Sequence, residues 1–107
     1  MATFGALISE RRKAMGLSQK ELAAKVRKED RSAISPQYLN DLEHDRRGAP
    51  SDQLIDEFAE VLGIDKDALY YSAGEVSPDL RGLNPENENV RNAIAAFRRN
   101  LEKENGE

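Results

Sequence analysis

The side chains capable of covalent or metal chemistry are few in this sequence. Among its 107 residues there is no cysteine and a single histidine, His44. A thiol nucleophile, a disulfide and a thiolate or two-histidine metal site are therefore ruled out. No nucleophile–base pair and no phosphate-cradling glycine loop is visible either. We expect a protein that is not an enzyme, needs no metal or cofactor, and acts through hydrogen bonds and charge.

Charge is unevenly distributed along the chain, although the net charge is only −4. Residues 1–31 carry eight Lys or Arg and four Asp or Glu, whereas residues 51–80 carry one Lys and eight acidic residues. Such a dipolar molecule can present one basic face to a polyanion, but charge alone is a weak indication. No apolar run approaches the ~18 residues of a membrane span. We therefore expect a cytoplasmic protein without membrane contact.

The elements that must position these groups are helices, and the pattern predicts an all-α domain of five helices over residues 3–73. Apolar residues recur at helical spacing in each segment. Residues suited to N-caps precede four of the five helices: Ser18, Ser35, Ser51 and Asp65. Ser18 and Glu21 have the spacing of a capping box, and Pro36 follows Ser35 at the first helical position.

A linker and one further helix are predicted beyond the five. From Ala73 to Asn84 the composition shifts to Gly, Ser, Pro and acidic residues. Asn84-Pro85 repeats the pattern of an N-cap followed by a first-turn proline. The helix after it carries a narrow apolar stripe typical of helix pairing: Val90, Ile94, Phe97 and Leu101. We expect a domain over residues 1–74 and, over 75–107, a linker plus an amphipathic helix that dimerises the protein or, alternatively, folds back on the domain.

The five-helix region resembles the helix-turn-helix domain of the phage-repressor-like (Cro/CI, XRE) family of transcriptional regulators. The matching segments are Leu17-Ser18-Gln19 with Glu21-Leu22-Ala23, Ile34-Ser35-Pro36-Gln37-Tyr38-Leu39 with Leu42-Glu43, Pro50-Ser51 with Leu54, and Leu62-Gly63-Ile64. The resemblance covers about residues 3–74 and sets several helices in a fixed order. It implies a sequence-specific DNA-binding regulator, most often a repressor, that acts as a homodimer in the major groove of an operator.

The resemblance also assigns roles to individual residues. DNA contacts are implied for the starts of two helices, the outer face of the second and the loop after it: Ser18, Gln19, Lys20, Ser35, Pro36, Gln37, Tyr38, Asn40, Asp41, Arg46 and Arg47. Free N–H groups at helix starts can donate hydrogen bonds to phosphate. Gln37 can form two hydrogen bonds with an adenine edge, and Asp41 can accept one from a cytosine amino group. Arg12 and Glu43 are implied to form a structural ion pair beneath the DNA-facing surface.

One segment departs from the family pattern. The usual turn between the two helices has about three or four residues, whereas Arg27–Ile34 separates them here. This stretch resembles an inserted loop. It either adds phosphate contacts through Arg27, Lys28 and Arg31 or is a solvated bulge.

A second hypothesis comes from a different class of function. The chain is then an antitoxin or adaptor-type interaction module whose main work is to bind a protein, such as a toxin, a protease or an anti-repressor. The acidic residues 51–80 or the C-terminal helix would form the contact. Selection of specific DNA from a random pool would support the regulator hypothesis. Tight binding of a protein partner without such selection would support the interaction module.

Overall fold

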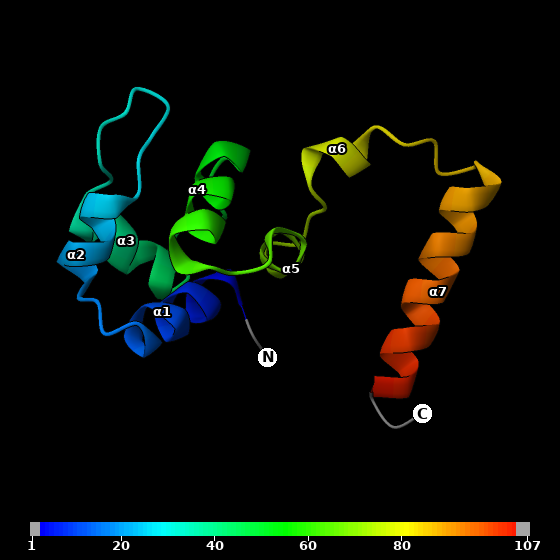
Figure 1. Cartoon of the computed structure of the whole chain (residues 1–107), viewed down its shortest axis with the longest axis horizontal. Helices are drawn as coiled ribbons and strands as arrows, with labels where there is room; N and C mark the ends of the chain where they lie inside the picture. The colour runs from blue at the N-terminus through cyan, green and yellow to red at the C-terminus, as the bar shows by residue number, and fades with distance from the viewer. Residues whose placement is uncertain (1–2, 105–107) are drawn as a thin grey trace. The chain divides into compact units, whose positions relative to one another are not determined.

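The computed structural model describes residues 3–104 and is helical without named strands over that range, which confirms the all-α fold class (Figure 1). The first unit contains the five expected helices, α1 (Phe4–Ala14), α2 (Gln19–Lys25), α3 (Pro36–Glu43), α4 (Asp52–Leu62) and α5 (Lys66–Ser72). Two further helices follow, α6 (Pro78–Arg81) and α7 (Glu88–Glu104). The chain divides into two compact units between Ser77 and Pro78.

The helix starts are set by side-chain caps. Ser18 accepts a hydrogen bond from the Glu21 N–H at 3.0 Å while Glu21 accepts one from the Ser18 N–H at 2.9 Å, a complete capping box. Ser35, Ser51 and Asp65 each accept from the N–H three residues on. The four caps expected within the first unit are therefore present, and each satisfies an N–H group that the helix itself leaves unpaired.

The core of the first unit joins all five helices. α1 packs on α3, α4 and α5, while α2 packs on α3. Phe4 and Phe58 meet edge to face with their ring centres 6.0 Å apart. At Gly5 an added Cβ would lie 2.2 Å from the carbonyl oxygen of Leu42, so α1 approaches the end of α3 too closely for any side chain there. The start of α1 and the end of α3 are thereby fixed to each other.

The connection between α2 and α3 is an ordered hairpin-like loop. Its two sides meet at an antiparallel bridge between Arg27 and Ala33, and the Ile34 N–H donates to the Val26 carbonyl at 3.1 Å. Val26 and Ile34 are buried, which anchors the base of the loop in the core. The amide of Gln53 on α4 donates to the Arg27 carbonyl at 2.8 Å. The extra residues thus project from a fixed base and leave the packing of α2 on α3 intact.

The second unit differs from the sequence expectation at the start of its long helix. The cap predicted at Asn84 with Pro85 in the first turn is wrong, because α7 begins at Glu88. Asn87 Oδ1 accepts from the N–H groups of Asn89 at 2.9 Å and Val90 at 3.4 Å and so acts as the cap. Asn84 instead accepts from the Glu86 N–H at 2.9 Å and closes a local turn. The segment read as a linker also contains the single turn of α6.

Candidate nucleic-acid interface

The orientation of α3 is decided by its two leucines. Leu39 and Leu42 are buried in the core, and residues three and four apart share one face of a helix. The opposite face is therefore directed outward. It holds Gln37, which is exposed, and Tyr38 and Asp41, which are half-buried at its edges. These are residues that the sequence analysis associates with contacts to bases.

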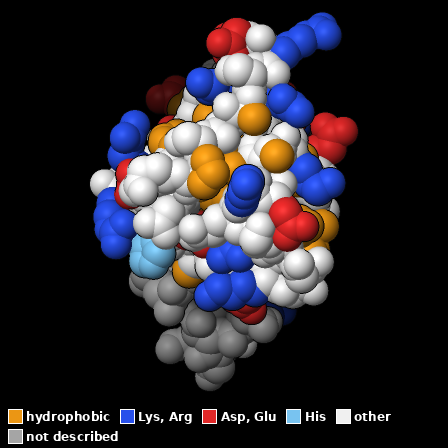
Figure 2. Space-filling model, turned by 90° about the vertical axis from the view of Figure 1, so that its left-hand side faces the viewer, with side chains coloured by type: hydrophobic (Ala, Val, Ile, Leu, Met, Phe, Trp, Pro, Cys, Tyr) orange, Lys and Arg blue, Asp and Glu red, His pale blue; other side chains and the backbone are white. Residues whose placement is uncertain are grey.

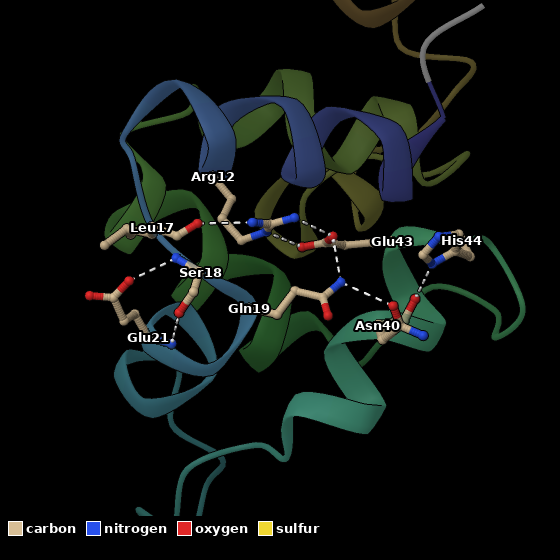
Figure 3. A network of polar contacts seen from close by, with 8 residues as sticks. All are labelled: Arg12, Leu17, Ser18, Gln19, Glu21, Asn40, Glu43 and His44. Carbon is tan, nitrogen blue, oxygen red and sulfur yellow. Dashed lines mark hydrogen bonds and ion pairs between the residues drawn. The ribbon is translucent and has the colours of Figure 1, made fainter.

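A buried ion pair lies beneath this face and joins α1 to α3 (Figure 3). Arg12 Nε donates to Glu43 Oε2 at 2.7 Å and Arg12 Nη2 donates to Glu43 Oε1 at 3.0 Å, a bidentate arrangement. A third guanidinium nitrogen, Nη1, donates to the Leu17 carbonyl at 2.8 Å. The side chains are only 10% and 2% exposed. Arg12 therefore ties α1, the turn before α2, and α3 together.

The side chain of Gln19 links α2 to α3 in the same network (Figure 3). Its Nε2 donates to Asn40 Oδ1 at 3.0 Å and to Glu43 Oε1 at 3.0 Å. A primary amide has two N–H groups, so both hydrogens of Gln19 are used within the protein. Asn40 is half-buried, and its amide oxygen is engaged in this link between the helices.

The network also sets the ionisation of its members. Burial of the Glu43 carboxyl acts to raise its pKa, but hydrogen bonds from Arg12, Gln19 and Ser9 and the charge of Arg12 outweigh burial and hold the pKa below its usual value. The hydrogen bond to Glu43 raises the pKa of Arg12 despite burial. Both groups are therefore charged at neutral pH, and the pair acts as a fixed ionic clamp.

The outer face of α3 has polar contacts of its own. Gln37 Nε2 donates to Asp41 Oδ1 at 3.0 Å. The same oxygen lies 3.5 Å from Nη1 of Arg46 in the loop after the helix. The Arg47 guanidinium stands over the Tyr38 ring at 5.1 Å from its centre. Both loop arginines expected to meet phosphate are thus held beside side chains expected to meet bases.

Asp45 anchors the loop that carries the two arginines. Its backbone is left-handed, with φ of 56°, a conformation that Asp tolerates better than most residues. Its carboxylate accepts from the Thr3 hydroxyl at 2.7 Å and from the Gly5 N–H at 3.2 Å. Only tertiary structure reveals this role, because the partners lie about forty residues away in sequence. The loop that carries Arg46 is thereby fastened to the start of α1.

Basic side chains surround this side of the molecule. Figure 2 views it from the side of α2 and the 26–35 loop, and the Lys and Arg side chains are spread around that face, with fewer acidic ones. Ser18 and Ser35 cap the two helices that begin here, and Lys20 is exposed in the first turn of α2. Within residues 3–104, no group of three or more His, Cys, Asp or Glu side chains has the arrangement of a metal site. The helices between residues 3 and 104 all lack the combination of length and hydropathy that a membrane span requires.

The apolar residues of α7 lie at the surface of the second unit. Ile94 is 57% exposed, Phe97 52% and Leu101 40%, while Val90 is half-buried. An open groove follows this stripe and is lined by Ile94, Phe97, Arg98, Leu101 and Glu102. Large apolar side chains gathered in this way mark a surface that is suited to contact with another protein surface.

Comparison with known proteins identifies the domain. A family model described as helix-turn-helix matches residues 8–69, more than half of the chain. Among solved structures, a SinR protein/SinI protein complex contains a chain that is 25% identical to this one, with a TM-score of 0.53. The match covers 96% of this chain and 95% of that chain, and therefore includes a C-terminal helix as well as the domain. No curated protein gives a match.

Proposed function

Since the chain belongs to the helix-turn-helix family of the phage-repressor (XRE) type, which consists of DNA-binding transcriptional regulators, we propose that it is a repressor that occupies an operator as a homodimer. One observation carries this proposal. The Arg12–Glu43–Gln19 network locks α2 against α3 and leaves the polar face of α3 turned outward. A helix presented rigidly in this way suits the major groove.

Base reading is assigned to the outer face of α3. Gln37 is exposed and carries both a donor and an acceptor, the combination that an adenine edge pairs with. Tyr38 offers a ring edge to a thymine methyl group, and Pro36 at the first helical position lies at the end that enters the groove. Asn40 belongs to the link with Gln19, so its contribution to binding is chiefly the position of the helix.

Phosphate contacts are assigned to groups at the two edges of this face. Arg46 and Arg47 follow α3, and Lys20 lies in the first turn of α2. Gln19 contributes its backbone N–H, because both of its side-chain hydrogens are donated to Asn40 and Glu43. Such contacts set register and affinity without selecting sequence.

Dimerisation is assigned to α7. Its apolar stripe is exposed and narrow, which suits pairing with a second copy of the helix. Acidic residues come early in this segment, at Glu86 and Glu88, and basic residues come late, at Arg98 and Arg99. An antiparallel partner would therefore bring opposite charges together at both ends. Two joined domains gain affinity by reading two half-sites.

A second candidate function is binding of a protein partner. The similar solved structure is a complex of two different proteins, SinR and SinI. The exposed stripe on α7 and the acidic residues of 51–80 are the surfaces available for such a partner. We place this second to DNA binding, because the rigid polar face of α3 would then have no role.

A pair of substitutions separates reading from positioning. Gln37→Ala is expected to weaken binding to the preferred site by ~1–3 kcal/mol and binding to random DNA much less, because it removes a base contact. Arg46→Ala is expected to weaken binding to both and to lower the salt dependence by about one phosphate contact. Fluorescence anisotropy with both duplexes at several salt concentrations measures the two effects.

The matched control is Asp67→Asn, an exposed change in the first turn of α5, away from α2 and α3. It should alter neither quantity by more than its small effect on net charge. If Gln37→Ala leaves the sequence preference unchanged, the reading surface is misplaced, and the hairpin-like loop before α3 becomes the first region to test.

A further inference from the structure

The side chain of Asp41 lies on the outer face of α3, beside Gln37, and joins the polar groups of this face. Its Oδ1 accepts from Gln37 Nε2 at 3.0 Å and lies 3.5 Å from Arg46 Nη1. We propose that Asp41 is a positioning residue that fixes the orientation of the Gln37 amide and, through it, the base pair that Gln37 selects. This inference rests on the proposed DNA-binding function and adds a determinant of its specificity.

The chemistry of the contact allows only one orientation of the amide. An ionised carboxylate accepts hydrogen bonds and cannot donate them. Gln37 must therefore turn its NH₂ group toward Asp41, since the flipped amide would set its oxygen against the carboxylate. One N–H is used in this bond, and one N–H and the amide oxygen of Gln37 remain. Asp41 thereby determines which side of the amide is the donor side.

The remaining donor and acceptor of Gln37 match one purine better than the other. Adenine presents an acceptor at N7 and a donor at N6 in the major groove, so it can pair with both groups of a correctly oriented amide. Guanine presents acceptors at both N7 and O6. The oxygen of an amide held in the same orientation would face the guanine O6 and find no donor. A fixed amide therefore favours adenine over guanine, whereas a freely rotating amide discriminates less.

Asp41 is itself held in place on a surface that meets a polyanion. Its side chain is 21% exposed, against 58% for Arg46. The Arg46 N–H donates to the Asp41 backbone carbonyl at 2.9 Å, which folds the loop back so that the guanidinium lies beside the carboxylate. The positive charge of Arg46 offsets the repulsion between Asp41 and phosphate. The carboxylate is thus available to hold Gln37 while the helix lies against DNA.

The test compares four full-length proteins: the parent, Asp41→Asn, Gln37→Ala and the double variant. Each is allowed to select duplexes from a random DNA pool, and its affinity is then measured for the parent's selected site with each base pair replaced in turn. Asn is the same size as Asp but can donate to the oxygen of Gln37, so both amide orientations become possible. Asp67→Asn, with the same change of charge, is the matched control.

We expect Asp41→Asn to reduce the adenine-over-guanine discrimination about tenfold at the base pair that Gln37→Ala identifies, within the range of one bidentate contact. Affinity for random DNA should stay the same or rise, because a negative charge is lost. At that base pair the double variant should behave like Gln37→Ala alone. Thermal melting of each variant verifies that the fold is retained.

Three results would overturn the inference. Unchanged discrimination in Asp41→Asn would show that the amide is not fixed by the carboxylate. A loss at a different base pair, or one that persists in the Gln37→Ala background, would show that Asp41 reads a base itself. If the parent selects no sequence from the pool, the proposed function fails as well, which separates that failure from a failure confined to Asp41.

Discussion

Removal of α7 is expected to convert the protein into a monomer that binds its operator about a hundredfold more weakly or worse. The reason is the loss of the second half-site, since joining two binding modules raises affinity by roughly 10²–10⁴ without any new contact. A chain ending after Gly82 should still fold. Every buried hydrophobic residue in the described range lies between Phe4 and Tyr70, within the first unit. Analytical ultracentrifugation and anisotropy measure the two expected changes.

A point variant tests the same surface in the full-length chain. Ile94→Asp places a charge in the middle of the apolar stripe, where pairing would bury it without a partner. Asn92→Asp is the matched control, because it adds the same charge on the opposite side of α7. We expect Ile94→Asp to sediment as a monomer and Asn92→Asp to behave like the parent. A truncated protein that remains dimeric would move the interface to the helical domain, with α4 and α5 the first candidates.

The second large effect is expected at the buried ion pair. Glu43→Ala should lower the free energy of unfolding by about 3 kcal/mol, because it leaves Arg12 charged, buried and without its carboxylate. For a domain of this size, that loss corresponds to a fall of roughly 12–24 °C in Tm. Gln19 also loses one of its two acceptors. Thermal and urea unfolding measure the change, and DNA binding should decline along with the fold.

Two further variants make this expectation specific. Glu60→Ala, an exposed change on α4, should alter stability by no more than about 0.5 kcal/mol. The double variant Arg12→Met/Glu43→Leu should recover much of the loss, since apolar residues of similar volume often replace a buried ion pair at little cost. If Glu43→Ala unfolds at the same temperature as the parent, the pair does not hold α1 to α3 as described.

The pH dependence of stability follows from the same pair. The pKa of Glu43 is lowered in the folded protein, so the unfolded state binds the proton more readily. The stabilisation is then present above the ordinary carboxyl pKa of about 4.3, and it is lost as the pH falls through the lower folded value. The unfolding free energy of the parent should therefore fall more steeply below about pH 4.5 than that of Glu43→Gln. Parallel curves for the two proteins would contradict the expectation.

Local sequence signals predicted the first unit well because each acts over a few residues. A serine side chain that accepts from the N–H three residues on caps the start of a helix, and Ser18, Ser35 and Ser51 all do so. The same reasoning was wrong at Asn84. Asn87, three residues further on, caps α7 instead, and Asn84 closes a local turn.

Partners distant in sequence were harder to foresee. The helical period places Asn40 near the outer face of α3, but its side chain is directed to Gln19 on another helix. Likewise, Asp41 has the chemistry of a base-reading group, and only its contact with Gln37 suggests a positioning role. Position on a helix is determined by the period, whereas a side-chain partner depends on tertiary packing. For that reason the expected Arg12–Glu43 pair is found, whereas the Gln19–Asn40 and Gln37–Asp41 hydrogen bonds were not foreseen.

Specific recognition of DNA by α3 in a homodimer can be measured by sequencing the duplexes that the full-length protein selects from a random pool at low salt. We expect a two-fold symmetric motif whose half-sites lie about one helical turn, ~10 base pairs, or a multiple of it apart. The logarithm of the affinity for that motif should fall linearly with the logarithm of the salt concentration, with a slope of ~0.9 per phosphate contact. If the folded protein enriches no sequence but binds a protein partner tightly, specific DNA recognition is ruled out. The chain would then be a protein-interaction module.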